Sequence, residues 1–91
     1  MLPVVWLDEA RRDLAEITAY IAQHSPAAAR RLNRLIVEQT DILSEHPTLF
    51  HAGRVLGTRE LVAHPNYVIV YRVTLATVEI LNVLHARQQY P

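Results

Sequence analysis

Seven consecutive residues, Tyr67 to Val73, constrain the fold of this chain more than any other segment. Valine, isoleucine and tyrosine occupy every position except Arg72, which gives the segment high β propensity and no polar face. A strand that is apolar on both sides belongs in the interior of a sheet, because both of its faces must be covered. The chain must therefore supply neighbouring strands and a covering layer.

The neighbouring strands are predicted directly before and after this segment. Residues 59–64 form one strand, and Pro65-Asn66 has the composition of a turn. Residues 74–77 turn the chain again, and residues 78–85 form the next strand. Three consecutive strands therefore make a meander, preceded by a loop over residues 48–58 that contains both glycines.

The first half of the chain has helical periodicity instead. Asp8 is in place to cap the first helix, which ends near His24 because Pro26 disfavours helix at the residue before it. Ser25 and Pro26 are themselves a start signal for a second helix, closed by Pro47. Apolar residues recur at helical spacing in the first helix, at Ala10, Leu14, Ile17 and Ile21. One face of the second helix carries Ala28, Leu32, Leu35, Ile36, Gln39, Ile42 and Leu43.

The order of elements follows from these patterns. A short strand over Val4–Leu7 comes first, and its Trp6 is expected in the core or at an interface. The two helices are separated by so few residues that they form an antiparallel hairpin. We therefore predict a single α+β domain, residues 1–91, of order β-α-α-β-β-β, with the helical hairpin on one face of a small, twisted, mainly antiparallel sheet.

Composition excludes several function classes. The chain has no cysteine, and its five histidines have no zinc-site spacing, so neither a metal site nor a cofactor is expected. The formal net charge is zero, which argues against coating of nucleic acid by bulk charge. No apolar run reaches the roughly 18 residues of a membrane span, and the N-terminus has no signal-peptide pattern, so a cytoplasmic location is expected.

All nine basic residues are arginine. Arginine recognises phosphate and carboxylate groups in a bidentate manner, so one interpretation is a binding function. The other interpretation is codon usage in a GC-rich genome, which would affect every basic position alike.

Several segments together resemble the RelE/ParE toxin superfamily. They are the helix start at residues 8–14, the Ser25-Pro26-Ala27-Ala28-Ala29 junction, residues 57–62, the strand at residues 67–73 and the C-terminal residues 78–91. The resemblance covers essentially the whole chain. It implies a toxin whose partner is a cognate antitoxin, with which it forms a hetero-oligomer.

The superfamily contains two activities on one fold. Members similar to RelE are ribosome-dependent endoribonucleases that cut messenger RNA, and members similar to ParE poison DNA gyrase. The ribosome or gyrase is accordingly the expected target. A third possibility is a non-toxic binding module that serves only in a repressor complex with the antitoxin.

A ribonuclease needs an acid, a base and cations around the scissile phosphate. The resemblance implies an arginine early in the central strand, where this chain has Val68. It also implies His-Tyr or Tyr near the C-terminus, where this chain has Ala86-Arg87-Gln88-Gln89 and no His-Tyr pair. A ribonuclease would therefore need a rearranged site, and the available catalytic residues are His85, Arg87, Arg59 and Tyr90.

The end of the last strand, His85-Ala86-Arg87, is more similar to ParE-like members. A gyrase poison needs an exposed surface that binds its target and no acid–base pair. Arginine and aromatic side chains are the usual anchors of such a surface. The resemblance therefore favours gyrase inhibition without enzymatic activity, with Arg87, Tyr90, Arg54 and Phe50 as target-binding residues.

The residues proposed to bind antitoxin are Arg72, Arg30, Arg34 and Trp6. Arg72 either faces an antitoxin carboxylate or pairs with Glu79 across the meander. The arginines of the second helix either contact antitoxin or form a solvated face. The antitoxin segment itself is expected to cover the helical hairpin or to add a strand to a sheet edge.

Overall fold

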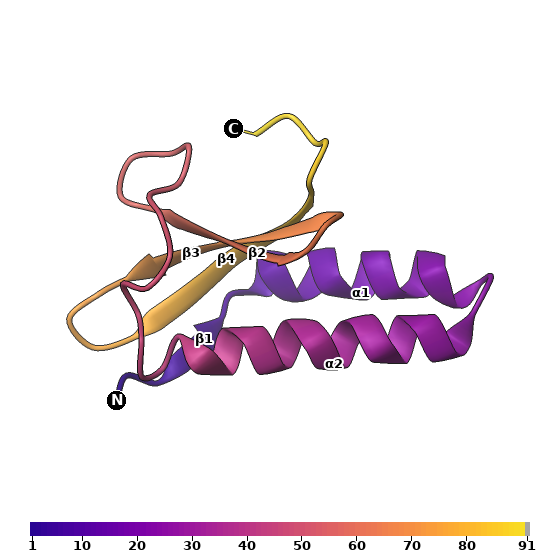
Figure 1. Ribbon diagram of the computed structural model, residues 1–91, viewed down its shortest axis with the longest axis horizontal. Helices are drawn as coiled ribbons and strands as arrows, with labels where there is room; N and C mark the ends of the chain where they lie inside the picture. The colour runs from indigo at the N-terminus through magenta and orange to yellow at the C-terminus, as the bar shows by residue number, and fades with distance from the viewer. Residues whose placement is uncertain (91) are drawn as a thin grey trace.

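The computed structural model describes residues 1–90. The strands are β1 (Val4–Trp6), β2 (Arg59–His64), β3 (Tyr67–Val73) and β4 (Val78–His85), and the helices are α1 (Asp8–Ala22) and α2 (Pro26–Ile42). The predicted order β-α-α-β-β-β and the predicted α+β architecture are confirmed (Figure 1). The ranges of the three strands after the helices are also confirmed.

The sheet has the strand order β1-β4-β3-β2. Strands β2, β3 and β4 are antiparallel to their neighbours and form the predicted meander, whereas β1 pairs in parallel with the start of β4 through Val4–Val78 and Trp6–Ile80. This pairing places β3 and β4 in the interior of the sheet. The apolar composition of Tyr67 to Val73 is thereby explained, because β3 has a strand on each side and a covered surface on each face.

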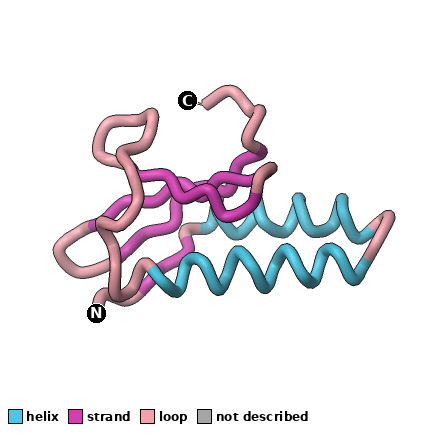
Figure 2. Tube along the Cα trace, in the orientation of Figure 1, coloured by secondary structure: helices cyan, strands magenta, loops and turns pink. Residues whose placement is uncertain are grey.

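The helical hairpin covers one face of the sheet (Figure 2). Residues of the hairpin such as Ala10, Leu32 and Ile36 pack there against Ile69 and Tyr71 of β3. Tyr67 and Tyr71 both contribute to this core, as expected for two residues on the same face of a strand. The molecule measures 40 × 27 × 22 Å, and its long axis follows the helices, which extend beyond the end of the sheet.

The helix boundaries show one wrong prediction and one confirmed prediction. Asp8 is not the N-cap of α1: Leu7 has this position in an extended conformation without a side-chain cap, and Asp8 is the first helical residue. An acidic residue in the first turn still interacts favourably with the helix dipole. Ser25 does cap α2, because its hydroxyl accepts a hydrogen bond of 3.1 Å from the Ala28 N–H. Helix α2 ends at Ile42, ahead of Pro47.

The opposite face of the sheet is also buried, although no helix lies on it. Val68, Val70 and Leu84 belong to this face through their register and are nearly inaccessible to solvent. The loop after α2 and the C-terminal segment both lie on this side in Figure 1. They are tied to the sheet by backbone hydrogen bonds such as Glu60 N–H to His51 O and Ala86 N–H to Asn66 O. We call this side the outer face.

Candidate functional site

A cluster of polar side chains crosses the outer face and joins the loop to the C-terminal segment. The Glu60 carboxylate accepts hydrogen bonds from the Arg54 backbone N–H at 2.9 Å and from Arg54 Nε at 3.0 Å. The Arg54 guanidinium lies 5.9 Å from the centre of the Tyr90 ring, which is within the range of a cation–π interaction. The Tyr90 hydroxyl reaches Asn82 Oδ1 at 3.4 Å. We call Arg54, Glu60, Asn82 and Tyr90 the outer-face cluster.

Asn82 connects this cluster to α1. Its side-chain amide donates to Asp13 Oδ2 at 3.2 Å, and the Val83 N–H donates to the same oxygen at 3.0 Å. Because β1 pairs only with residues 78–80 of β4, the rest of that strand edge has no partner strand. Asp13 therefore satisfies a backbone donor at an otherwise open edge.

The ionisation of Glu60 is fixed by its surroundings. Burial of this carboxyl raises its pKa, but the hydrogen bonds from Arg54 and the positive charges of Arg54 and His51 act more strongly together, so the pKa lies below its ordinary value. The carboxylate is thus charged in the folded protein and holds the loop onto β2.

We predict that Glu60→Gln lowers the free energy of unfolding by about 1–3 kcal/mol near pH 7, because a charge-assisted interaction with Arg54 is lost. A carboxyl whose pKa is lowered by folding stabilises the protein above the pKa of the unfolded chain, and that stabilisation is lost as pH falls through the lower, folded pKa. The difference between wild type and variant should therefore shrink below about pH 4. Urea unfolding from pH 3 to pH 7 measures it, and a difference that is independent of pH would contradict this account.

The residues available to a ribonuclease are not brought together. His85 is opposite Tyr67 and Arg59 is opposite Tyr71, four residues further along β3, which separates their backbones by about 13 Å along the strand. The Arg59 guanidinium donates a hydrogen bond of 2.8 Å to the Phe50 carbonyl and a longer one to the Thr48 carbonyl. Arg59 therefore has no ion pair within residues 1–90, whereas Glu60 pairs with Arg54.

His85 and Tyr90 also lie on different sides of the sheet. His85 lines a cleft against α1, and its Nδ1 accepts a hydrogen bond from the Arg87 N–H at 3.1 Å. Tyr90 belongs to the outer-face cluster. These four side chains therefore do not surround one position at which a phosphate could be cleaved.

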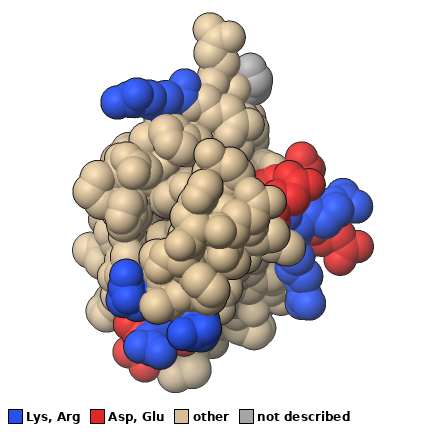
Figure 3. Space-filling model, turned by 90° about the vertical axis from the view of Figure 1, so that its right-hand side faces the viewer, with Lys and Arg blue, Asp and Glu red and all other residues tan. Residues whose placement is uncertain are grey.

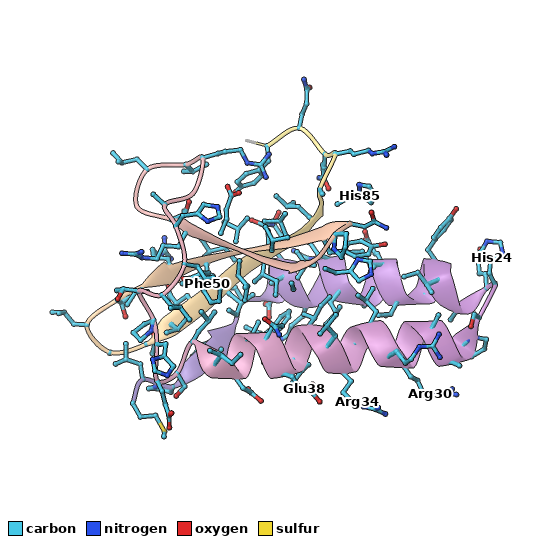
Figure 4. The ribbon with its side chains drawn as sticks, viewed as in Figure 1. His24, Arg30, Arg34, Glu38, Phe50 and His85 are labelled. Atoms are coloured by element: carbon cyan, nitrogen blue, oxygen red, sulfur yellow. The ribbon has the colours of Figure 1, made fainter. Side chains whose placement is uncertain are left out.

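Two of the four target-binding candidates share one site. Arg54 and Tyr90 contact each other in the outer-face cluster, and Arg87 is exposed nearby in the chain. Phe50 is elsewhere: its side chain packs against the core, and in Figure 4 it lies at the end of the sheet far from His85. Its backbone carbonyl holds Arg59, so Phe50 has a structural role in this fold.

Arg72 pairs with Glu79, which confirms one of its two predicted roles. The guanidinium contacts Glu79 Oε1 through Nε at 2.8 Å and through Nη2 at 2.6 Å. These residues are directly opposite each other in the register of β3 and β4. The Arg72 side chain is still 49% exposed, so a further acidic group has access to it.

The other antitoxin-binding candidates line a groove between the two helices. Arg30 and Arg34 point away from the sheet along α2, as does Glu38 (Figure 4). Between the helices lies a groove of about 800 Å³, continued by a hollow of about 540 Å³ that Trp6 lines. We call these together the hairpin groove. Its lining is mainly small or apolar: Ala15, Thr18, Ala19, Ala22, Pro26, Ala29 and Val37.

The sequence interpretation missed this groove, although a signal was present. Ala15, Ala19 and Ala22 recur at helical spacing on α1, beside the apolar stripe that faces the core. Small residues keep two helices close and leave a shallow depression between them. Asp13 and Asn82 were also missed, because a contact between residues 69 positions apart leaves no local pattern.

Charge is distributed in separate groups over the surface. Figure 3 looks at the tip of the helical hairpin and shows charged side chains at the margins, with a broad uncharged area between them. Acidic and basic side chains lie together at the right and the lower left, and a basic side chain lies alone at the upper left. Within residues 1–90, no grouping of histidine, aspartate and glutamate could hold a metal ion. No helix in the same range is long and apolar enough to cross a membrane.

Comparison with known proteins identifies the family. Residues 4–90 match the model of the ParE toxin of type II toxin-antitoxin systems. The chain is 46% identical over 87 residues to Y4kP of Sinorhizobium fredii, covering 94% of this chain and 90% of that protein. It is 41% identical over 88 residues to Toxin RelE2 of Caulobacter vibrioides, covering 94% and 97%.

The fold leads to the same family. The structure described as the chromosomal ParDE TA system from P. aeruginosa superposes with a TM-score of 0.81 at 25% identity, covering 93% of this chain and 96% of that one. Sequence and fold therefore agree, and this protein belongs to the ParE toxin family of type II toxin-antitoxin systems.

Proposed function

We propose that this toxin inhibits DNA gyrase and is neutralised by a cognate antitoxin, and that it acts by binding and not by catalysis. The observation that carries this proposal is the separation of the residues that RNA cleavage would need. Arg59 is occupied by backbone carbonyls, and His85 and Tyr90 lie on different sides of the sheet. The match to the ParE family model also supports it.

The target surface is the region around the C-terminal segment. Arg87 is exposed, and Tyr90 is held over the sheet by Arg54 and Asn82. Aromatic and arginine side chains that are fixed in place lose little conformational entropy on binding, which makes them effective anchors. The C-terminal segment is therefore a contact surface whose shape depends on the outer-face cluster.

The test is supercoiling of relaxed plasmid by purified DNA gyrase with increasing amounts of toxin. We expect inhibition by the wild-type protein, and a loss of inhibition of roughly tenfold or more when Arg87→Ala and Tyr90→Ala are combined. Arg12→Ala is the matched control, because Arg12 is an exposed arginine of α1 outside both candidate surfaces. Undisturbed supercoiling at high toxin excess would overturn the gyrase proposal.

A second candidate is a ribosome-dependent ribonuclease, favoured by the names of two relatives, Toxin RelE1 and Toxin RelE2 of Caulobacter vibrioides. Induction without antitoxin separates the alternatives. Early arrest of DNA synthesis supports gyrase as the target, whereas early arrest of translation with cleaved messages supports the ribonuclease. Continued growth would indicate a binding module without toxicity.

The hairpin groove is the proposed binding site of the antitoxin. It is lined mainly by small and apolar residues, and its charged border has Arg11, Arg30 and Arg34 against one carboxylate, Glu38. It therefore suits an amphipathic segment with acidic residues at its edge. The solved relative is itself described as a ParDE toxin-antitoxin system, which supports a protein partner of this kind.

A further inference from the structure

A second depression lies on the other side of α1, where the helix faces the ends of β3 and β4. This cleft has a volume of about 410 Å³. It is separate from the hairpin groove, because the two are lined by different flanks of α1. Its functional groups are Asp13, Glu16 and Tyr20 of the helix, Tyr67 and His85 of the strands, and Gln88 after β4. We call it the tyrosine cleft.

The tyrosine cleft has an excess of negative charge. Two carboxylates line it, whereas none of the chain's nine arginines does. One Asp13 oxygen is used by Val83 and Asn82, which fixes this charge at the wall of the cleft. Glu16 is exposed, and its carboxylate makes no hydrogen bond or ion pair within residues 1–90. The cleft is therefore complementary to a cation.

Two tyrosine rings border the same cleft. The Tyr67 ring is held between His64 and His85, with ring centres 5.7 and 5.6 Å away. Tyr20 contacts His24 edge-on at 5.8 Å and remains 66% exposed. Rings fixed by their neighbours beside a carboxylate can bind a cation through their faces while the carboxylate accepts hydrogen bonds.

We propose that the tyrosine cleft binds an arginine side chain of the antitoxin segment that occupies the hairpin groove. A guanidinium is planar, stacks on aromatic rings and bonds a carboxylate with two N–H groups, so it fits Glu16 and the tyrosines better than a lysine ammonium does. The geometry links the two sites: Ala19 lines the hairpin groove, and its neighbour Tyr20 lines the cleft. A helix is about 10–12 Å across, so a few extended residues span it.

That the bound arginine belongs to the antitoxin rests on the proposed function. Binding of a cation in the tyrosine cleft can be tested without the antitoxin. The probe is a blocked five-residue peptide, Gly-Ser-Arg-Ser-Gly, and its twin has the uncharged analogue citrulline in place of arginine. NMR titration of the full-length toxin at pH 7.5 follows the ring resonances of the tyrosines. We expect shifts at Tyr20 and Tyr67 with the arginine peptide and binding roughly fivefold weaker or more with the citrulline peptide.

Glu16→Gln is the variant, and Glu45→Gln is the control because Glu45 is exposed near the end of α2, outside the cleft. Only Glu16→Gln should weaken the arginine peptide, again by roughly fivefold. Equal binding of the two peptides, or no effect of Glu16→Gln, would overturn the cation site and leave the gyrase result untouched.

The same two variants then test the occupant by titration with purified antitoxin. A loss of affinity for Glu16→Gln alone supports an antitoxin arginine in the cleft. Unchanged antitoxin affinity, in a protein whose cleft binds the arginine peptide, would reject antitoxin as the source of the cation.

Discussion

Tyr71→Ala should lower the free energy of unfolding by about 3–5 kcal/mol, as expected when a large buried aromatic side chain is removed from a core. Tyr71 is fully buried, lies in the interior strand β3 and packs in the core with residues of both helices and of β4. The ring is too large for its neighbours to fill the cavity. Urea unfolding followed by circular dichroism measures the change, and a loss below about 1 kcal/mol would contradict the central role of this residue.

Tyr71→Phe is the matched control. The Tyr71 hydroxyl oxygen is buried and makes no well-aligned hydrogen bond in the described part of the chain. Burial raises its pKa more than the nearby Arg59 and the Phe50 backbone lower it, so the hydroxyl stays protonated. Removing a buried polar group that has no partner costs little and can stabilise the protein. Phenylalanine should therefore leave stability unchanged or raise it, and a large loss would show that the hydroxyl is bonded in solution.

Ala19→Trp should weaken antitoxin binding by roughly a hundredfold, because the indole fills the hairpin groove and excludes a packed partner segment. Ala19 is exposed and lines this groove, so the larger side chain adds little strain within the isolated toxin. In cells that make both proteins, the variant should arrest growth where wild type does not. Titration calorimetry with purified antitoxin gives the affinity.

Ala27→Trp controls for the added indole, since Ala27 is equally exposed on α2 but does not line the hairpin groove. It should bind antitoxin as wild type does. If Ala19→Trp also keeps full affinity, the antitoxin does not lie in the groove, and a sheet edge becomes the site to examine.

The elements themselves could be predicted because their signals are local. The β-branched and aromatic run from Tyr67 to Val73 specifies a strand by steric preference, and Ser25-Pro26 specifies a helix start by a side-chain acceptor and a fixed φ angle. Both of these preferences act over a few neighbouring residues, so they can be recognised in the local sequence without knowledge of the tertiary structure. The misplaced boundaries differ by only one or two residues: Asp8 is the first helical residue and not the cap, β1 ends at Trp6, and α1 ends at Ala22.

Sites could be predicted only in part. The pair Arg72–Glu79 was one of two predicted alternatives, because a meander places nearby strand residues opposite each other. The partner of Glu60 in the pair Arg54–Glu60 could not be identified from the sequence, since it depends on the path of an irregular loop that no periodicity describes. Phe50 was interpreted as a surface anchor for the same reason, and the structure places it against the core.

The amino-acid sequence by itself determined the helices, the meander, the interior position of β3 and the likeness to one toxin superfamily, since each depends on short-range preference or on order along the chain. Only the tertiary structure decided that β1 pairs with β4, that Asp13 closes the open edge of β4 and that Tyr90 meets Arg54 over the outer face. It also decided that the two flanks of α1 line different depressions. The physical reason is that these contacts form when distant segments share the burial of one sheet, and burial depends on the whole fold and not on neighbouring residues.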